Sequence, residues 1–329
     1  MARPKLLVTH PLFEAPRKLL AEPFDVEYWT EPGRPSRAEF LRRAADKDGL
    51  ISLITEKIDA KLLASAPQLR MVANVAVGFD NVDLDACTRR GVAVSNTPGV
   101  LDETTADLTW TIMLAVARRL IEGDTMARSG QWKGWNLDQL CGTDVWGKTL
   151  GILGFGRIGR AVARRARGFS MRVLYCNPKR VPQEVEQELG AEFVERDVLL
   201  AQSDFVSLHV PLRPETRGMI GARELALMKP TAFLVNTTRG PVVQEAELAA
   251  ALAAGTIAGA ALDVYEREPE IHDGLRRPNV VLAPHLGSAS LETRTKMAVM
   301  AAENAVAFFS GRRPPNLLNP DALQGRMPS

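Results

Sequence analysis

The stretch Thr149-Leu150-Gly151-Ile152-Leu153-Gly154-Phe155-Gly156-Arg157-Ile158-Gly159 decides the fold, because three spaced glycines follow an apolar run and precede a helix-like segment. A glycine fingerprint in this context is typical of a dinucleotide-binding turn. Gly154 permits the tight turn, Gly156 lets the backbone approach a pyrophosphate, and Gly159 allows close packing of helix on strand. A glycine-rich turn without a ligand is the alternative interpretation.

The residues that follow these glycines suggest which dinucleotide binds. The N–H groups of Arg157 and Ile158 open the helix and are expected to face the phosphates. The next strand ends at Asn177, where NAD-binding domains place an acid for the ribose hydroxyls. A carboxylate would repel a 2′-phosphate, whereas Lys179 and Arg180 offer cations that pair with one. The sequence therefore favours NADP(H), with NAD(H) as the alternative if both cations are solvated loop residues.

Strand-like and helix-like runs alternate on both sides of the glycine turn, which is typical of α/β domains with parallel sheets. The length of 329 residues also favours two domains. A long helix from about Leu101 to Ser129 is expected to cross between them, and a last helix over Leu291 to Ser310 to return to the first. The strands predicted from the pattern are Lys5–Thr9, Asp25–Trp29, Gly49–Leu53, Met71–Val75 and Val92–Ser95, then Thr149–Leu153, Arg172–Cys176, Phe205–Leu208, Ala232–Asn236, Gly259–Leu262 and Val280–Leu282.

The bulk composition excludes several classes of protein. Lys and Arg number 41 against 39 Asp and Glu, so the net charge of +2 gives no reason to expect nucleic acid or a membrane surface as partner. The three cysteines fit neither a disulfide framework nor a metal site, and no metal is expected. The chain start lacks a signal peptide and no apolar run is long enough for a membrane span, so we expect a cytoplasmic protein.

Two clusters of side chains allow more than one interpretation. Trp132, Trp135 and Trp146 lie close together in sequence and indicate either a cover over the core or a subunit interface. The basic cluster that begins at Arg160 is interpreted as the solvated face of a helix, and its further members are Arg164, Arg165 and Arg167.

Three residues at predicted strand ends or in the adjoining loops have side chains that suit the reduction of a 2-oxo acid by a nicotinamide. His285 follows an apolar strand and can protonate a developing alkoxide near neutral pH. A carboxylate beside it would orient the ring and stabilise imidazolium, and on spacing alone either Glu266 or Glu268 qualifies. Arg239 can grip a substrate carboxylate bidentately and polarise the carbonyl. Ligands in such sheets bind at the carboxyl ends of the strands.

Several motifs in order resemble those of the D-isomer-specific 2-hydroxyacid dehydrogenases, most closely the glyoxylate/hydroxypyruvate and 2-ketogluconate reductase branch. The resemblance covers nearly the whole chain. It rests on Asn74-Val75-Ala76-Val77-Gly78-Phe79-Asp80-Asn81, Asn96-Thr97-Pro98-Gly99, Glu103-Thr104-Thr105-Ala106-Asp107-Leu108, Gly154 to Gly159, Thr237-Thr238-Arg239-Gly240, Asp263 to Pro269, and Pro284-His285.

The resemblance implies two Rossmann-like domains with doubly wound parallel sheets. A discontinuous substrate domain, residues 1–99 and 291–329, would enclose a dinucleotide-binding domain over residues 100–290 that includes the crossing helix and a dimerisation segment. It also implies a homodimer, which suits the tryptophan cluster.

The resemblance further implies roles for single residues. Glu268 rather than Glu266 would be the partner of His285, and the N–H groups of Val77 and Gly78 would hold the substrate carboxylate together with Arg239. Leu53 would line the substrate pocket. The positions implied along the cofactor are Asp263, at the nicotinamide carboxamide, Thr104, Thr238 and the loop from Pro211 to Thr216.

The implied activity is NAD(P)H-dependent reduction of glyoxylate, hydroxypyruvate or 2-ketogluconate to the D-2-hydroxy acid. One departure weakens the NADP(H) assignment, since many NADPH-using relatives have Arg where Pro178 stands. An enzyme resembling 3-phosphoglycerate dehydrogenase is the first alternative. A corepressor-like protein that senses dinucleotides is the second, because a fold does not decide a function.

Overall fold

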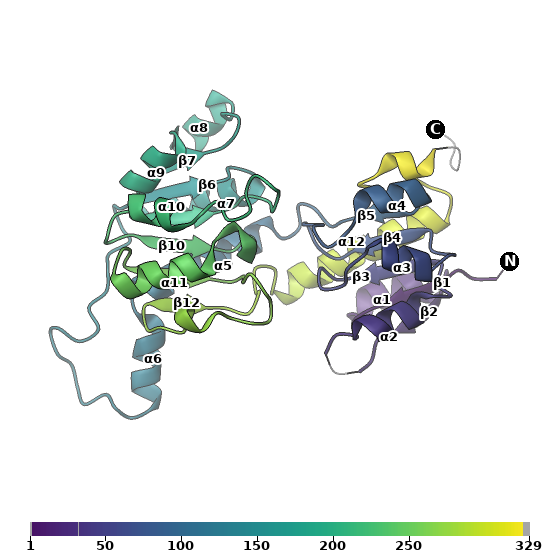
Figure 1. The fold of residues 1–329 in the computed structure, drawn as a ribbon, viewed down its shortest axis with the longest axis horizontal. Helices are drawn as coiled ribbons and strands as arrows, with labels where there is room; N and C mark the ends of the chain where they lie inside the picture. The colour runs from purple at the N-terminus through teal and green to yellow at the C-terminus, as the bar shows by residue number, and fades with distance from the viewer. Residues whose placement is uncertain (1, 32, 325–329) are drawn as a thin grey trace. The chain divides into compact units, whose positions relative to one another are not determined.

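The computed structural model describes residues 2–31 and 33–324, which form two compact units (Figure 1). Unit 1 comprises residues 1–101 and 290–329 of the chain, and unit 2 comprises residues 102–289. Each unit contains one parallel sheet with helices on both faces, which confirms the predicted α/β class.

Unit 1 contains a five-stranded sheet in the order β2-β1-β3-β4-β5, with every neighbouring pair parallel. This is one of the two common doubly wound strand orders. Its strands are β1 (Lys5–Val8), β2 (Asp25–Tyr28), β3 (Gly49–Ser52), β4 (Met71–Asn74) and β5 (Ala93–Ser95), and its helices are α1 (Glu14–Ala21), α2 (Arg37–Ala44), α3 (Ala60–Ser65), α4 (Leu84–Arg90) and α12 (Leu291–Phe309).

Alternate residues of these strands enter two separate cores. Leu6 and Ile51 pack with α1 and α12 on one face, while Leu7 and Leu50 pack with α2, α3 and α4 on the other. Both faces of the sheet are thus covered, as parallel sheets require. The strands consequently consist of apolar runs rather than an alternating pattern, and all residues of β3 and β4 are buried.

Unit 2 contains a seven-stranded parallel sheet in the order β12-β11-β10-β9-β6-β7-β8. The order reverses between β6 and β9, which is where such sheets bind ligands. The pattern-based prediction missed β8 (Ala191–Phe193), a short edge strand with an exposed centre. The other strands are β6 (Thr149–Leu153), β7 (Arg172–Cys176), β9 (Phe205–Leu208), β10 (Phe233–Asn236), β11 (Gly259–Leu262) and β12 (Val280–Leu282).

The helices of unit 2 also form two layers. One layer packs on the face that includes Ile152 and Tyr175, and the other on the face that includes Leu153 and Leu174. The first layer contains α5 (Asp102–Ala117), α7 (Arg157–Ala166) and α8 (Gln183–Leu189), and the second contains α9 (Arg196–Gln202), α10 (Ala222–Leu227) and α11 (Glu245–Ala254).

The long crossing helix expected from the sequence is broken in two. After α5 ends, Arg119 adopts a left-handed conformation with φ of 51°, and α6 (Leu120–Arg128) begins in a new direction. The N–H of Thr143 donates to the carbonyl of Ala117 at 2.8 Å. The chain that returns after α6 thus supplies a hydrogen-bond donor to the last carbonyl group of α5. A Cβ on Gly142 would lie 2.3 Å from that carbonyl oxygen, so this approach requires glycine.

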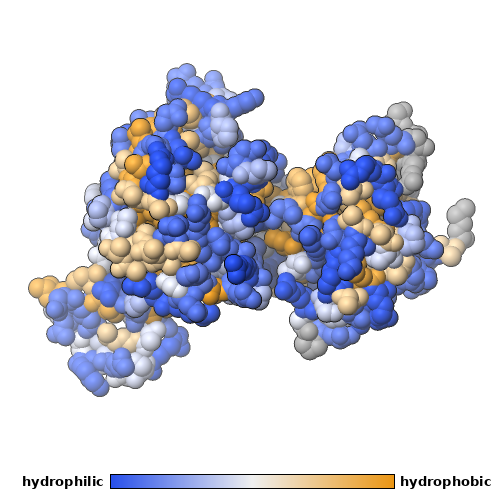
Figure 2. All heavy atoms as spheres, viewed as in Figure 1, coloured by the Kyte–Doolittle hydropathy of each residue, from blue (hydrophilic) through white to orange (hydrophobic). Residues whose placement is uncertain are grey.

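The segment from α6 to β6 projects from the rest of unit 2 (Figure 1). Several of its large apolar side chains are exposed. Trp135 is 79% exposed and Trp146 is 72% exposed, so the interpretation of the tryptophans as a cover over the core is wrong for this chain by itself. Figure 2 shows apolar spheres at the outer tip of this lobe, at the lower left, among hydrophilic ones. We define the projecting lobe as residues 118–147.

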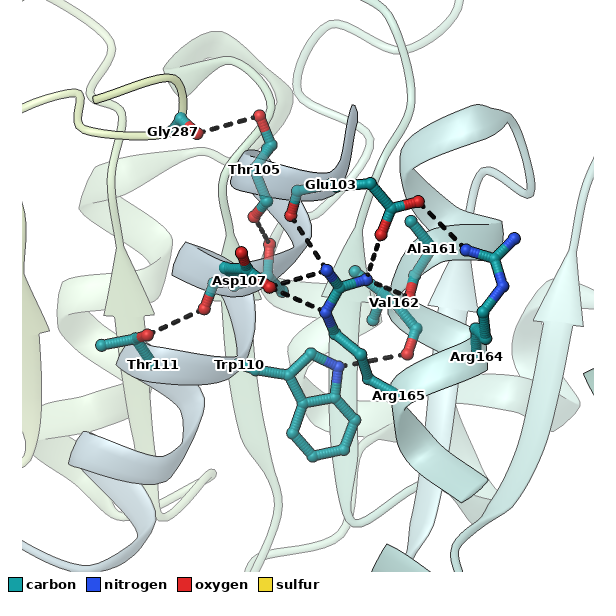
Figure 3. Close-up of polar contacts among 11 residues, drawn as sticks. Glu103, Thr105, Asp107, Trp110, Thr111, Ala161, Val162, Arg164, Arg165 and Gly287 are labelled. Atoms are coloured by element: carbon teal, nitrogen blue, oxygen red, sulfur yellow. Dashed lines mark hydrogen bonds and ion pairs between the residues drawn. The ribbon is translucent and has the colours of Figure 1, made fainter. Parts of the chain in front are cut away.

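The basic cluster of α7 is not simply a solvated face, which corrects the sequence-based interpretation. Arg165 joins α7 to the first turns of α5 by donating to Glu103 at 2.7 Å and to Asp107 at 2.6 Å (Figure 3). It also donates to the backbone carbonyl oxygens of Glu103 and Ala161. Trp110 adds a second link between the helices, because its indole N–H donates to the carbonyl of Val162 at 3.1 Å.

We predict that Arg165→Ala lowers the stability of unit 2 by roughly 1–2 kcal/mol, because a planar, multiply bonded arginine network contributes more than an isolated surface pair. Arg164→Ala is the matched control, since Arg164 is more exposed and makes a single 3.0 Å contact with Glu103. We expect its effect to stay within about 0.5 kcal/mol. Thermal unfolding measures both variants, and equal shifts would contradict the proposed role of Arg165.

Candidate functional site

The glycine turn follows β6 at the point where the strand order reverses, and each glycine has a steric reason. Gly154 has φ of +94°, and a Cβ there would lie 2.5 Å from the carbonyl oxygen of His209. A Cβ on Gly159 would lie 2.3 Å from the carbonyl oxygen of Gly154, so the helix packs directly on the turn. Gly156 faces open space, with no protein atom within 4 Å of a Cβ. The turn therefore leaves room for a ligand against the Gly156 backbone.

The N-terminus of α7 suits an anion. Gly156 caps the helix without a side chain, and the first backbone bond of the helix is from the N–H of Arg160 to Gly156. The N–H groups of Arg157 and Ile158 precede that bond and lie in the first turn, where the helix dipole favours negative charge. These features fit the pyrophosphate of a dinucleotide.

Asn177 lies next to this turn. Its side-chain oxygen accepts the N–H of Phe155 at 3.3 Å, and its amide nitrogen donates to the carbonyl of Lys179 at 3.0 Å. The side-chain amide of Asn177 thus connects the glycine turn to the loop after β7, and it does so as an uncharged group. Among residues 2–31 and 33–324, no ion-pair partner of Lys179 is present within 4 Å.

Arg180 differs from Lys179 because a carboxylate already holds it. Its Nε and Nη2 donate to the two oxygens of Glu186 at 2.9 and 2.8 Å. The phenol of Tyr175 also donates to Glu186 and accepts the N–H of Val181. The bonds from Arg180 and Tyr175 lower the pKa of Glu186 to about 2. Glu186 therefore compensates the charge of Arg180, which makes Arg180 a weaker partner for a 2′-phosphate than the sequence predicts.

The loop after β10 is shaped around Arg239. Asn236, the last residue of the strand, donates its amide to the carbonyl of Arg239 at 3.0 Å and accepts the N–H of Thr238 at 3.0 Å. Arg239 itself is half-buried and donates from Nη1 to the carbonyl of Thr238 at 2.8 Å. A Cβ on Gly240 would overlap the carbonyl carbon of Tyr265 at 1.8 Å, so glycine is required where this loop meets the segment after β11.

His285 follows β12 and is paired with Glu268. The Nδ1 atom of His285 lies 2.8 Å from Oε2 of Glu268, and Oε1 of Glu268 accepts the N–H of Tyr265 at 3.1 Å. About a third of each side chain is exposed. His285 has φ of 55°, an uncommon conformation for a residue other than glycine. Because Glu268 engages Nδ1, Nε2 is the ring nitrogen available to a substrate.

Electrostatics support the pairing of Glu268 with His285. Partial burial opposes ionisation of Glu268, but the hydrogen bond and charge of His285, together with Arg239, outweigh it and lower the pKa of Glu268. Glu266 points elsewhere, because its carboxylate accepts the N–H of Glu245 at 3.2 Å at the start of α11. The geometry thus separates two glutamates that spacing alone could not.

Asp263 at the end of β11 holds the backbone around His285. Its carbonyl accepts the N–H of His285 at 2.9 Å, and its carboxyl oxygens accept the N–H groups of Leu286 and Gly287 at 2.6 and 2.8 Å. Only 1% of Asp263 is exposed. This burial raises the pKa of Asp263 to about 6, despite the two N–H bonds. Asp263 therefore orients the loop that carries His285.

The other three histidines differ from His285. Burial lowers the pKa of His209 to about 3, and its Nε2 lies 2.8 Å from the hydroxyl of Ser207. Burial likewise lowers the pKa of His10 to about 4. His272 caps a short 3₁₀ turn by accepting the N–H of Gly274. Among these residues, only His285 combines partial exposure with a carboxylate partner.

The remaining positions expected along the cofactor also lie in unit 2. Thr104 is half-buried in the first turn of α5. The hydroxyl of Thr216 donates to the carbonyl of Pro211 at 2.6 Å and closes that loop after β9. The hydroxyl of Thr238 donates to the carbonyl of Val210, which connects this loop to the Arg239 loop. These bonds account for the shape of the loops and do not identify a ligand.

In unit 1, hydrogen bonds to the carbonyl groups of Ala76 and Val77 hold the Val77–Gly78 turn in place. The N–H of Thr97 donates to the carbonyl of Ala76 at 2.9 Å, and the amide of Asn96 donates to the carbonyl of Val77 at 2.9 Å. In a trans peptide the C=O and the following N–H point in opposite directions. The N–H groups of Val77 and Gly78 are therefore directed away from these contacts, as a donor pair for a carboxylate requires.

Leu53 follows β3, where a turn places it half-buried beside the core of unit 1. Asn81 links this turn to the Val77–Gly78 turn, because its amide donates to the carbonyl of Leu53 at 3.2 Å and its side chain lies 3.4 Å from the amide of Asn74. Asn74 in turn donates to the carbonyl of Gly78 at 3.1 Å.

Several asparagines that shape these loops have no role predicted from the sequence. A signal was present, because Asn74 and Asn236 are polar residues that end otherwise apolar buried strands, where an unpaired amide would be costly. Within residues 2–31 and 33–324 the structure contains no group of three or more metal-ligating side chains. It also contains no helix long and apolar enough to span a bilayer, within those same limits.

Comparison with known proteins gives consistent matches. Residues 110–287 match the family model described as D-isomer specific 2-hydroxyacid dehydrogenase, NAD binding domain. A glyoxylate reductase of Thermococcus litoralis is 48% identical over 99% of this chain and 100% of its own, and one of Korarchaeum cryptofilum is 50% identical over 99% of both. The NADPH-dependent glyoxylate/hydroxypyruvate reductase of Sinorhizobium meliloti, solved with NADP and malonate, superposes with a TM-score of 0.85 at 32% identity over 98% of both chains.

We predict that the stability difference between the wild-type protein and Asp263→Asn changes with pH. The folded pKa of Asp263 lies above its unfolded value, so the native state gains a proton as pH falls through about 6 while the unfolded chain does not. Between pH 7 and pH 5 the wild-type protein should therefore gain roughly 1 kcal/mol relative to the variant. Thermal unfolding across this range measures the difference.

The control for this pH series is Asp273→Asn, because the side chain of Asp273 is 99% exposed. Its difference from the wild-type protein should not vary over the same pH range. A constant difference for Asp263→Asn as well would refute the raised pKa.

Proposed function

The chain belongs to the D-isomer specific 2-hydroxyacid dehydrogenases, and we propose that it reduces glyoxylate or a related small 2-oxo acid with a nicotinamide cofactor. It is an oxidoreductase of the NAD(P)-dependent kind. The observation that carries the proposal is the His285–Glu268 pair at 2.8 Å, at the same carboxyl edge of the sheet as the Arg239 loop and the glycine turn.

The cofactor suits the turn after β6. Gly154, Gly156 and Gly159 would accommodate the pyrophosphate, which the N–H groups of Arg157 and Ile158 would bind. The bound nicotinamide would supply a hydride to the carbonyl carbon of the substrate. Asp263 would accept a hydrogen bond from the N–H of the nicotinamide carboxamide. Thr104, Thr238 and the loop from Pro211 to Thr216 would line the rest of the cofactor.

The chain's own residues would bind the substrate and manage one proton. Arg239 would bind the substrate carboxylate bidentately, with the N–H groups of Val77 and Gly78 as further donors, and Leu53 would line the pocket. As the carbonyl carbon receives the hydride, the carbonyl electron pair moves to oxygen. That oxygen takes the proton from Nε2 of His285. Glu268 would hold the ring by Nδ1 and stabilise the imidazolium that precedes transfer.

We propose NADP(H) as the favoured cofactor and NAD(H) as the weaker one. Asn177 supports this, because an amide stands where an acid would repel the 2′-phosphate. Lys179 is the stronger candidate for pairing with the phosphate, since Glu186 compensates the charge of Arg180. The S. meliloti relative that is described as NADPH-dependent is consistent with this preference.

A homodimer through the projecting lobe is also part of the proposal. Its support is the exposure of large apolar side chains in residues 118–147, which a single chain leaves in water. The side chains concerned are Leu120, Ile121, Trp132, Trp135, Leu137 and Trp146. Sedimentation equilibrium of the purified protein measures this state.

The activity is tested by following absorbance at 340 nm with NADPH and NADH against glyoxylate, hydroxypyruvate, 2-ketogluconate, pyruvate and 3-phosphohydroxypyruvate. Fast oxidation of NADPH with glyoxylate or hydroxypyruvate is the expected result. Turnover mainly with NADH and the phosphorylated acid would instead favour an enzyme like 3-phosphoglycerate dehydrogenase. Cofactor binding without turnover of any acid would refute the proposed reaction.

We predict that His285→Ala lowers kcat by about 100-fold or more, because general acid catalysis contributes roughly that much. His272→Ala is the matched control, since His272 caps a 3₁₀ turn and has no part in the proposed reaction. It should retain the wild-type kcat. Steady-state kinetics at saturating cofactor measure both variants, and a normal kcat in His285→Ala would exclude His285 as the proton donor.

We predict that Asn177→Asp shifts the ratio of kcat/KM for NADPH to that for NADH about 10-fold or more toward NADH, because the new carboxylate would repel a 2′-phosphate and accept ribose hydroxyls. Asn279→Asp makes the same chemical change before β12, at the amino edge of the sheet, and should leave the ratio unchanged. An unaltered ratio in Asn177→Asp would disprove this account of the ribose pocket.

A further inference from the structure

Glu56 is a buried carboxyl group that the proposed reaction does not use. Only 5% of the residue is exposed, and it lies in the turn that follows β3. Its Oε2 accepts the backbone N–H of Leu53 at 2.6 Å and the hydroxyl of Thr9 at 2.8 Å, while Oε1 accepts the hydroxyl of Thr55 at 2.6 Å. All three partners are neutral donors. A buried carboxyl group with three such bonds is a costly element that needs a compensating role.

The effect of these bonds is to immobilise the backbone of Leu53. Its N–H is held by Glu56, and its carbonyl accepts from the amide of Asn81 at 3.2 Å and from the N–H of Glu56 at 3.3 Å. Thr9 anchors the carboxyl group to the end of β1, because its own N–H donates to the carbonyl of Ile51 at 3.1 Å. With both peptide groups held, the backbone fixes where the Leu53 side chain starts, and the apolar core of unit 1 supports it on one side.

The opposite edge of the same sheet offers a comparison. There the carboxylate of Asp48 accepts the N–H of Lys5 at 2.8 Å and so also joins the chain before β3 to β1. Asp48 is partly exposed and pairs with Arg70 at 3.1 Å, an ordinary arrangement for a surface carboxylate. Glu56 makes a similar connection without a cation or solvent, at the carboxyl edge, where parallel sheets bind ligands.

We propose that Glu56 is a positioning residue that sets the substrate selectivity of the enzyme through Leu53. The inference rests on the proposed function, because the contact between Leu53 and the 2-oxo acid is itself part of that proposal. Glu56 holds the turn so that Leu53 forms a fixed wall against the group attached to the substrate carbonyl. A fixed wall discriminates between the hydrogen of glyoxylate and the larger groups of pyruvate and hydroxypyruvate, whereas a mobile wall accepts all three.

The test compares Glu56→Ala with Asp48→Ala, which removes the corresponding carboxylate from the other edge of the sheet. We define the spread as the ratio of the highest to the lowest kcat/KM among glyoxylate, pyruvate and hydroxypyruvate. In Glu56→Ala we expect this spread to shrink about 10-fold. The KM for NADPH should stay within about 2-fold of the wild-type value. Asp48→Ala should lower the melting temperature and leave the spread unchanged. Glu56→Gln keeps an oxygen for the N–H of Leu53 and should restore most of the selectivity.

Hydrogen exchange supplies a readout that does not depend on turnover. The amide of Leu53 should exchange faster in Glu56→Ala and not in Asp48→Ala, because only the first change removes its acceptor. If Glu56→Ala fails to fold, Thr9→Val removes one anchor of the carboxyl group with little change in shape, and it should show the same trend more weakly.

An unchanged spread in a folded Glu56→Ala protein would overturn the inference, even if the Leu53 amide exchanges faster. Equal narrowing in Asp48→Ala would also overturn it, since the effect would then be general destabilisation. A wild-type protein that turns over none of the acids would refute the proposed function itself, and the selectivity role would fall with it.

Discussion

The parallel alignment of the strands in unit 2 is the constraint on which its chemistry depends. Because β6, β10, β11 and β12 run in one direction, their carboxyl ends meet along one edge of the sheet. That edge carries the glycine turn, the Arg239 loop, Asp263 and His285. A single antiparallel strand among these four would move its residue to the other edge of the sheet.

Close contacts between backbone segments hold the loops at this edge of the sheet near one another. Gly240 approaches Tyr265 more closely than any side chain would permit, and Gly154 does the same at His209. These contacts bring adjacent loops together without intervening side chains. Arg239 can then influence the ionisation of Glu268, and Glu268 can hold His285, although the three residues come from separate loops. Packing and electrostatics are thus coupled at the candidate site.

Polar side chains at strand ends do a similar task in both units. Asn236 and Asp263 hold loops in unit 2, while Asn96 and Glu56 hold loops in unit 1. Each is buried, and the side chain of each bonds to the backbone of a residue placed on a ligand in the proposed reaction or, for Asp263, to the backbone of the two residues that follow His285. Buried polar groups of this kind reduce the number of conformations that a loop can adopt, because leaving them unpaired would be costly.

The sequence by itself determined the α/β class and the glycine turn, and it supplied the candidates for the reacting side chains. All of these depend on local patterns, namely apolar runs of strand length, glycine spacing and polar residues after strands. It did not reveal the break at Arg119, the edge strand β8 or the pairing of Arg180 with Glu186. Each of these depends on contacts between segments distant in sequence or on one unusual backbone angle.

Apart from the family resemblance, only the tertiary structure distinguishes Glu268 from Glu266 as the partner of His285. The two residues are separated by a single position and have the same chemistry, so spacing favours neither. The fold turns Glu266 toward the N–H of Glu245 at the start of α11 and brings Glu268 within 2.8 Å of His285. Which carboxylate meets a given histidine is fixed by how loops from different strands pack, and that information is not local to either residue.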